Sequence, residues 1–512
     1  MDSTSNNKRI AKNTIFLYIR MMIIMLVTLF TSRIILQSLG VEDYGIYNLV
    51  GGVTSMFTFL NGALSDATQR YLTFEIGRGK EGNVNKIFSL CMILHIIMAV
   101  IVVIITEIIG LWFMYNKLQI PAERMDAAFW VFQFSVASMF IMFVSVPYNA
   151  LIIAHERMKA FAFISIFTTG INLLIAYALF LSGSFDRLIL YGFLLFVLQI
   201  ITRLIYNHYC RRNFEESKFR LIWDSAKVKE LAGFMSWTII GNISYITYTQ
   251  GLNLLLGMFF LPVVNAARGI AIQVQSAANQ FVRSFQTAIN PQITKTYAAN
   301  DYEAMYTLVC RGSRFSSFLL MIPIVPIIVG TPILLNMWLT EIPDYTCDFI
   351  RIILLTSWIN GLSNPLGISN MATGNIKLYQ LTVATIKLLI LPIAYVCLQL
   401  GYSPVSVFIA HLFIECIAYI VNIIITHHLT KLPVNKYIRD VILRVFPIVA
   451  SSLMLSVGFY SIMKNDIISF ILMSIFSFVC SAILIYAVGL SKDERDFLKG
   501  KVIVIINKKR AC

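Results

Sequence analysis

The sequence predicts an all-α polytopic membrane protein with about 14 transmembrane helices, and three observations support this class. Of the 512 residues, 58% are hydrophobic and only 13% are charged, and a soluble globular protein of that composition would aggregate. Apolar stretches of about 20 residues, each long enough to cross a bilayer, follow one another along the chain. Lys and Arg fall almost entirely in every second gap between these stretches.

The predicted spans leave only short gaps, so there is no room for a soluble catalytic domain and we expect no enzyme. The sequence also lacks the GxxxxGK[ST], HExxH and GxSxG patterns, which excludes an ATP motor and the common hydrolases. In chain order the predicted spans are 13–37, 44–69, 86–112, 127–153, 160–183, 187–209, 231–256, 262–290, 305–338, 347–372, 376–400, 402–427, 438–463 and 466–490.

The alternating basic gaps predict the topology. Lys and Arg remain on the cytoplasmic side of a membrane, so the basic N-terminus, the gap around Arg211 and Arg212 and the basic C-terminal tail are expected to be cytoplasmic. The net charge of +15 follows from this topology, and we expect no nucleic-acid partner. The eight cysteines show no paired spacing, which predicts neither disulfides nor a metal site.

An internal repeat divides the chain. Pro147, Ala154 and Lys159 recur as Pro365, Ala372 and Lys377, at an offset of about 218 residues. Two copies of six spans each would enter the membrane in the same sense, an arrangement typical of alternating-access transporters. The predicted organisation is a six-helix lobe (1–209), a cytoplasmic linker (210–230), a second six-helix lobe (231–430), two additional helices (431–490) and a basic cytoplasmic tail (491–512).

Basic residues within the spans are candidates for binding an anion. If they line one cavity, they suit a phosphate or another acidic group through charge-assisted hydrogen bonds. The alternative is that they snorkel to the membrane surface or pair with a carboxylate. Position favours snorkelling for Arg70, favours the cavity for Arg268 and Lys387, and leaves both open for Arg33 and Arg283.

Acidic residues and a histidine within the spans are candidates for coupling transport to H⁺ or Na⁺. His411 and Glu415 are four residues apart and therefore share a helix face. The alternative is a structural pair, or a counter-ion to Lys387. Asp66 is open to the same two interpretations.

Several segments carry a family resemblance. The piece LGVEDYGIY at Leu39–Tyr47, PYNALIIAHERMK at Pro147–Lys159 and NAARGIAIQV at Asn265–Val274 resemble the Wzx-type O-antigen and capsule flippases. These are polysaccharide transporters of the multidrug/oligosaccharidyl-lipid/polysaccharide flippase superfamily. The resemblance covers nearly the whole chain in the number and order of spans.

The resemblance implies transport of undecaprenyl-pyrophosphate-linked oligosaccharide repeat units across the bacterial cytoplasmic (inner) membrane, toward the periplasmic leaflet. It also implies two six-helix lobes in a V-shaped arrangement, two C-terminal helices and a cationic cavity that by span position would include Arg33, Arg70, Arg268 and Arg283. No cofactor is implied besides a coupling ion. The implied partners are the lipid-linked substrate, membrane lipids, and the polysaccharide polymerase and chain-length machinery.

Three other functions compete with this one. A multidrug antiporter of the same superfamily would need acidic cavity residues to bind cations, whereas the spans of this chain hold more bases than acids. A lipid II flippase would share the 14 spans and the basic cavity. A membrane-embedded polymerase or glycosyltransferase would need a large catalytic loop. The sequence alone does not identify the glycan.

Overall fold

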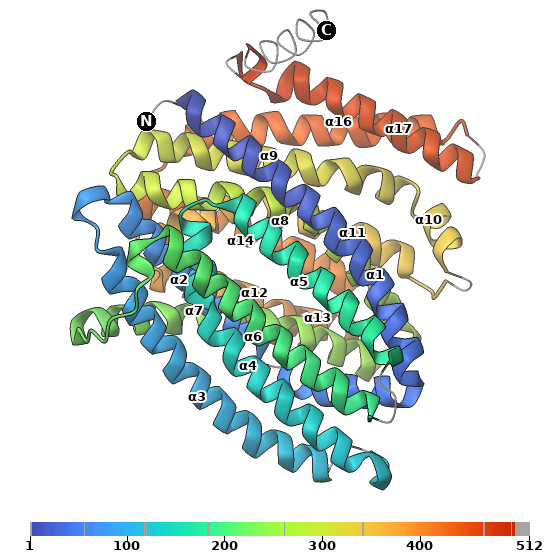
Figure 1. Cartoon of the computed structure of the whole chain (residues 1–512). Helices are drawn as coiled ribbons and strands as arrows, with labels where there is room; N and C mark the ends of the chain where they lie inside the picture. Colours follow the sequence, from blue (N-terminus) through green and yellow to red (C-terminus); the bar gives the residue numbers. More distant parts are fainter. Residues whose placement is uncertain are drawn as a thin grey trace, which may run out of the picture. The chain divides into compact units, whose positions relative to one another are not determined.

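The computed structural model of the chain describes residues 3–55, 57–116, 118, 120–181, 185–260, 262–339, 342–463, 466–492 and 494–496. Among these residues the secondary structure is helical throughout, with no strand (Figure 1). The predicted all-α class is therefore confirmed. The part of the predicted basic tail that follows residue 496, including Lys508 and Arg510, lies outside the described residues.

The helices follow the predicted spans closely. In chain order they are α1 Ser3–Ser55, α2 Thr58–Gly77, α3 Val84–Asn116, α4 Met125–Ala154, α5 Met158–Ala178, α6 Arg187–Asn213, α7 Ser225–Phe259, α8 Pro262–Ala298, α9 Tyr302–Val329, α10 Thr331–Trp338, α11 Thr346–Ala372, α12 Lys377–Leu388, α13 Ile390–Gln399, α14 Val405–Thr430, α15 Val434–Tyr437, α16 Leu443–Tyr460 and α17 Ile467–Leu484. Single turns of 3₁₀ or π helix add Gly79–Glu81, Ala122–Arg124, Leu179–Leu181, Glu215–Ser217, Ile438–Ile442 and Ile485–Gly489.

Ten segments of the described chain are helical, long and apolar enough to cross a membrane. The four predicted spans that are not among them, 44–69, 231–256, 262–290 and 347–372, are helical as well, in α1 and α2, α7, α8 and α11. Polar side chains of α7, α8 and α11 line a pocket, as described below.

Breaks in the helices occur at glycine and at turns. Gly40 has φ 82° and ψ 169°, a conformation that residues with a Cβ rarely adopt, and it separates the first predicted span from the second. The second span is itself divided between the end of α1 and α2. The predicted span 305–338 is divided between α9 and α10 at Gly330, and the span 376–400 between α12 and α13 at Leu389.

The chain forms two compact units, each discontinuous in sequence. Unit 1 contains Met1–Ile243, Thr287–Tyr302 and Met371–Gln380, and unit 2 contains Ser244–Gln286, Glu303–Asn370 and Leu381–Cys512. Helices α7, α8, α9, α11 and α12 each contribute residues to both units. The division into two six-span lobes with a linker at 210–230 stays a prediction.

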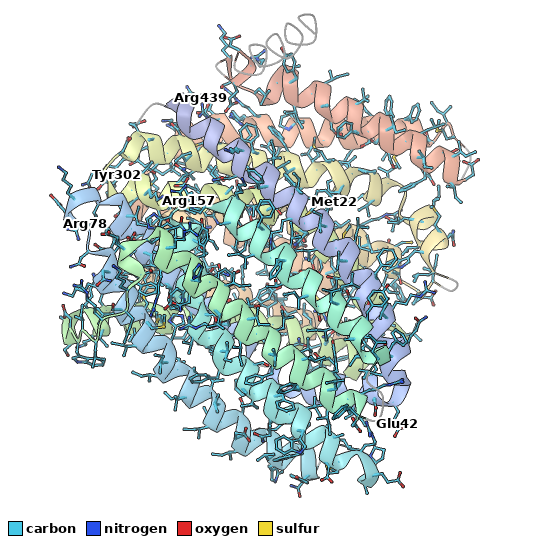
Figure 2. All side chains as sticks on the ribbon, viewed as in Figure 1. Met22, Glu42, Arg78, Arg157, Tyr302 and Arg439 are labelled. Carbon is cyan, nitrogen blue, oxygen red and sulfur yellow. The ribbon has the colours of Figure 1, made fainter. Side chains whose placement is uncertain are left out.

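Aromatic side chains hold the core of unit 1 together. Phe88 on α3 meets Tyr148 on α4 edge to face, with ring centroids 5.2 Å apart, and Tyr71 on α2 meets Phe234 on α7 in the same way. Large apolar side chains also remain on the surface, such as Met22 on α1, which is 46% exposed (Figure 2). Exposed apolar residues of this kind are expected where a helix faces lipid.

The two copies of the predicted repeat share an unusual backbone feature. Glu156, between α4 and α5, has φ 58°, and Gly374, between α11 and α12, has φ 81°. These positions are separated by the repeat offset of about 218 residues. Gly77 and Lys295 are separated by the same offset, and a Cβ added to Gly77 would lie 2.8 Å from the Lys295 carbonyl oxygen. The repeated turn and this contact between equivalent positions support the predicted duplication.

Arg124 forms ion pairs with two aspartates in unit 1. The Arg124 guanidinium donates hydrogen bonds to both carboxylate oxygens of Asp43, at 2.9 and 2.7 Å, and to Asp186 Oδ2 at 2.5 Å. Asp186 also accepts hydrogen bonds from the backbone N–H groups of Leu188 and Ile189, so it is the N-cap of α6. Partial burial raises the pKa of Asp186, but the hydrogen bonds from Arg124 and from these backbone groups outweigh it, so the pKa lies below its ordinary value.

Asp186→Asn and Asp186→Ala should separate the two roles of this carboxylate. The Asp186→Asn variant keeps the helix cap and loses only the partly exposed ion pair with Arg124. Its free energy of unfolding should therefore fall by no more than about 1 kcal/mol. Ala also removes the cap, which costs about 1 kcal/mol more. Because the folded-state pKa is lowered, the carboxylate stabilises fully above its ordinary pKa, and that stabilisation is lost as the pH falls from about 4 through the lowered folded-state pKa. Thermal unfolding at pH 7 and at a series of pH values below about 4 checks this, and a wild-type advantage over Asn that does not shrink along that series would contradict it.

Candidate functional site

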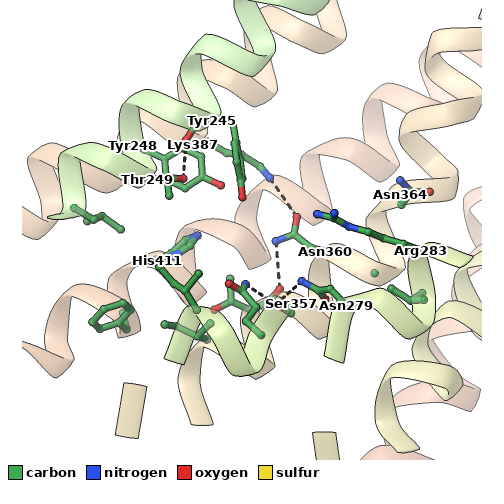
Figure 3. Close-up of a pocket in the computed structure, with 18 of the residues that line it drawn as sticks. Tyr245, Tyr248, Thr249, Asn279, Arg283, Ser357, Asn360, Asn364, Lys387 and His411 are labelled. Carbon is green, nitrogen blue, oxygen red and sulfur yellow. Dashed lines mark hydrogen bonds between the residues drawn. The ribbon is translucent and has the colours of Figure 1, made fainter. Parts of the chain in front are cut away.

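A pocket of about 330 Å³ lies within unit 2, lined by side chains of α7, α8, α11, α12 and α14 (Figure 3). Three basic residues reach it: Arg268 and Arg283 from α8 and Lys387 from α12. The structure thus brings together three of the five basic residues that the sequence singles out, including the two for which the cavity was favoured. Their role in substrate binding stays a prediction.

Helix α8 supplies five of the polar side chains that line the pocket, because its sequence is amphipathic. Gln275, Asn279, Arg283 and Gln286 recur at intervals of three and four residues, which places them on one face of the helix. Arg283 is exposed, and Figure 3 shows its guanidinium in the pocket near Asn360. The same helix therefore presents both charge and amide groups to the cavity.

Arg268 is held firmly by α7. Its guanidinium donates a hydrogen bond of 2.8 Å to the Thr249 carbonyl oxygen and another to the side-chain oxygen of Asn253. The residue is only 3% exposed, so its charge is nearly withdrawn from solvent. Buried positive charge that is fixed in place raises the affinity of the adjoining pocket for anions.

Lys387 is shared between two acceptors. Its ammonium group lies 2.9 Å from Glu415 Oε1. It also lies 3.3 Å from Asn360 Oδ1, a contact marked by a dashed line in Figure 3. The Glu415 side chain is 2% exposed, and its second oxygen, Oε2, has no hydrogen-bond partner among the described residues. The geometry is that of a counter-ion to Lys387, one of the two alternatives that the sequence left open. A role for Glu415 in binding a coupling ion stays a prediction.

His411 lies one helical turn before Glu415 on α14 and forms part of the pocket wall. Its ring meets the ring of Tyr248 edge to face at 5.4 Å, and Tyr248 meets Tyr245 in the same way. The Nε2 atom of His411 is buried and has no hydrogen-bond partner among the described residues. The aromatic wall and the basic groups therefore border the same cavity.

Amide side chains complete the pocket, and the sequence analysis missed them. Gln275 donates to Ser357 Oγ at 2.6 Å, and Asn279 donates to the same oxygen at 3.4 Å. Gln286 donates to the Gly361 carbonyl oxygen at 3.3 Å. The available signal was a row of amides with helical spacing inside a predicted span, which is unusual for a surface that faces lipid.

The other candidate residues are in unit 1 and do not line this pocket. Arg33 is exposed on α1, and Asp66 is exposed on α2. Arg70 is buried on α2, where it donates hydrogen bonds of 3.0 and 2.5 Å to the carbonyl oxygens of Met371 and Ala372. These carbonyls belong to the last turn of α11 and have no partner within the helix, so Arg70 caps that helix. Snorkelling, the interpretation favoured from position, is therefore wrong for Arg70, while its role in substrate binding, like the roles of Arg33 and Asp66, stays a prediction.

No protein-family model matches the sequence, and no curated protein matches it. Solved structures do match, at low sequence identity. An outward-facing multidrug resistance MATE family transporter of the MOP superfamily aligns with a TM-score of 0.69 and 15% identity, over 82% of this chain and 96% of that chain. A MATE protein in its bent conformation aligns with a TM-score of 0.72 and 15% identity, over 83% and 96%.

A third solved structure is described by the polarity of its binding pocket. It is a MOP superfamily transporter from Pyrococcus furiosus, described as having a binding pocket of reverse polarity that suggests a different function. It aligns with a TM-score of 0.67 and 15% identity, over 82% of this chain and 96% of that chain.

The ten spans and this fold make the chain a multi-pass membrane protein. Its fold is that of the MATE family transporters of the MOP superfamily. The match in fold supports the predicted fold class as well.

Proposed function

We propose that the protein is a flippase. It moves undecaprenyl-pyrophosphate-linked oligosaccharide repeat units from the cytoplasmic to the periplasmic leaflet by alternating access, for the synthesis of O-antigen, capsule or exopolysaccharide. The observation that carries the proposal is the basic pocket formed by Arg268, Arg283 and Lys387 within a membrane transporter fold.

The charge of the pocket suits the pyrophosphate group. Hydrocarbon offers no partner to an anion, so a charged head group needs a polar path across the membrane. Arginine and lysine donate charge-assisted hydrogen bonds to phosphate oxygens, each contributing about 1.5 to 3 kcal/mol. The adjoining amides and Tyr245 add hydrogen-bonding and aromatic surface suited to sugar rings.

The multidrug antiporter is the main alternative, and the pocket argues against it. A cationic drug would meet three basic side chains there, and Glu415 is already paired with Lys387. The description of the P. furiosus transporter shows that proteins of this fold differ in pocket polarity and, by inference, in substrate. A lipid II flippase would satisfy the same charge argument and is distinguished only by its substrate.

We also propose a location and partners for the protein. The protein lies in the bacterial inner membrane with both termini in the cytoplasm, in contact with membrane lipids and with the polysaccharide polymerase and chain-length machinery. It takes no nucleic acid and needs no cofactor besides a coupling ion.

The test uses a strain that lacks the protein and is complemented with variants. Without the protein, lipid-linked repeat units should accumulate on the cytoplasmic side and the surface glycan should be missing. Arg283→Gln should reduce export about tenfold or more, because one charged contact to phosphate is lost. Arg283 is exposed, so its loss should hardly affect folding.

Arg212→Gln is the matched control, since Arg212 is also exposed but lies at the end of α6, outside the pocket. It should export normally. A normal glycan with altered drug sensitivity in the deletion strain would favour the antiporter, and accumulation of the peptidoglycan precursor would favour the lipid II flippase.

A further inference from the structure

We propose that binding of an anion to Lys387 is coupled to the uptake of one proton by Glu415. The inference rests on the proposed function, because it assumes an anionic substrate in the pocket of unit 2. It extends that function by assigning the coupling ion and the residue that carries it.

Lys387 lies between a buried carboxylate and the pocket. Its ammonium group is paired with Glu415 at 2.9 Å, while Glu415 is on α14 and almost completely buried. Lys387 also lines the pocket, so the same ammonium faces both the carboxylate and the space that a substrate would fill. A phosphate in the pocket and the Glu415 carboxylate therefore compete for one cation.

The competition has a predictable consequence for the carboxylate. When Lys387 turns to a phosphate, Glu415 is left as a buried charge without its cation. An unpaired buried charge costs several kcal/mol, and such groups avoid this cost by becoming neutral. Glu415 would then take one proton from solvent and become a carboxylic acid, Lys387 would remain an ammonium ion, and the added proton would offset one negative charge of the substrate.

Two buried polar atoms, one on Glu415 and one on His411, can accept the proton. Glu415 Oε2 and His411 Nε2 are both buried polar atoms without partners among the described residues, and the two side chains share a face of α14. Both atoms can accept a proton. His411 thus offers a relay between the pocket, which it lines, and the carboxylate.

Other charged or titratable groups act on this pair. Lys387, on α12, pairs with Glu415. The positive charges of Lys387 and of Arg268, which is on α8, also interact with His411. Tyr248 on α7 and Cys416 on α14 also interact with Glu415, and such groups ordinarily lose their protons only above about pH 8. Glu415 and His411 are therefore the groups of this cluster that are suited to hold the added proton.

The test measures the binding of farnesyl pyrophosphate, a short polyprenyl pyrophosphate, to the purified full chain. Calorimetry in buffers of different ionisation enthalpy gives the number of protons taken up per ligand. The wild-type protein should take up about one proton more than Glu415→Gln. The variant should also bind the probe more tightly at pH 8, because Lys387 no longer has an internal competitor.

Glu107→Gln is the matched control. Glu107 is another carboxylate within a membrane helix, but it is on α3 in unit 1, where it accepts a hydrogen bond from Gln133. The Glu107→Gln variant should bind the probe and take up as many protons as the wild type does. Comparison with this variant also accounts for the protons that the probe itself gains.

The outcomes separate this inference from the proposed function. Equal proton uptake by Glu415→Gln and Glu107→Gln would overturn the coupling, while binding that still depends on Arg283 would leave the flippase intact. No binding of the probe by the wild type would overturn both. If Glu415→Gln does not fold, Lys387→Gln takes its place, and proton uptake as large as in the wild type would again overturn the coupling.

Discussion

Replacing Glu156 with Gln is expected to lower the free energy of unfolding by about 3 kcal/mol. The Glu156 side chain is 1% exposed, and its carboxylate lies 2.6 Å from the Lys295 ammonium group. It also accepts a hydrogen bond from Gln292, and its backbone carbonyl accepts one from Asn13. The substitution leaves Lys295 with a neutral acceptor in a mostly buried place, so most of the cost comes from the uncompensated charge.

A double variant tests that explanation. If the Lys295 charge causes most of the loss, the double variant Glu156→Gln, Lys295→Met should lose less stability than the sum of the losses in the two single variants. Thermal or denaturant unfolding of the purified protein measures each step. Additive losses would show that the pair is not coupled and would contradict the argument.

An exposed pair of the same type provides the control. Glu303 lies 2.9 Å from Lys436, but Glu303 is 78% exposed. Water already solvates both groups, so Glu303→Gln should change the free energy of unfolding by less than about 1 kcal/mol. The comparison isolates burial, because the distances in the two pairs are similar.

Gly77→Ala is expected to destabilise the protein by about 2 kcal/mol, since overfilling a tight contact costs about 1 to 3 kcal/mol. A Cβ at this position would lie 2.7 Å from the Cβ of Ala298 and 2.8 Å from the Lys295 carbonyl oxygen. Both distances are shorter than normal contacts, and one partner is backbone, so the ends of α2 and α8 would have to separate. The same movement would disturb the ion pair between Lys295 and Glu156.

A second glycine on α2 gives the matched control. Nothing lies within 4 Å of the position that a Cβ would occupy at Gly62. Alanine favours a helix over glycine by about 1 kcal/mol, so Gly62→Ala should be neutral or stabilising. Unfolding temperatures of the two variants check the contrast, and equal effects would show that the close approach at Gly77 is unimportant.

Much of the fold was predictable from local patterns. The predicted spans match the helices to within a few residues at most ends, because a stretch of apolar residues about 20 long has few alternatives in a bilayer. The span 262–290, in α8, was predicted from an apolar window of about 20 residues, although that helix is not among the ten that are apolar enough to count as spans. The polarity of α8 was itself evidence for a pocket.

The candidate site was predicted only in part. Arg268 and Lys387 were assigned to a cavity from their apolar flanks, and both line the pocket. Asn360 and Ser357 were missed, because an isolated amide or hydroxyl within a span is as often a contact between helices. Arg70 caps the end of α11 through carbonyls about 300 residues away, and no local pattern shows such a partner.

The sequence by itself determined that this is a helical membrane protein, and it predicted an internal repeat and an excess of basic over acidic residues within the spans. These properties depend on hydrophobicity, spacing and charge, which are local and add up along the chain. Only the tertiary structure decided which charges meet: Lys387 with Glu415, Lys295 with Glu156, and Arg268 with the backbone of α7. A buried charge requires a partner, but packing between distant helices decides which partner comes within a few ångströms.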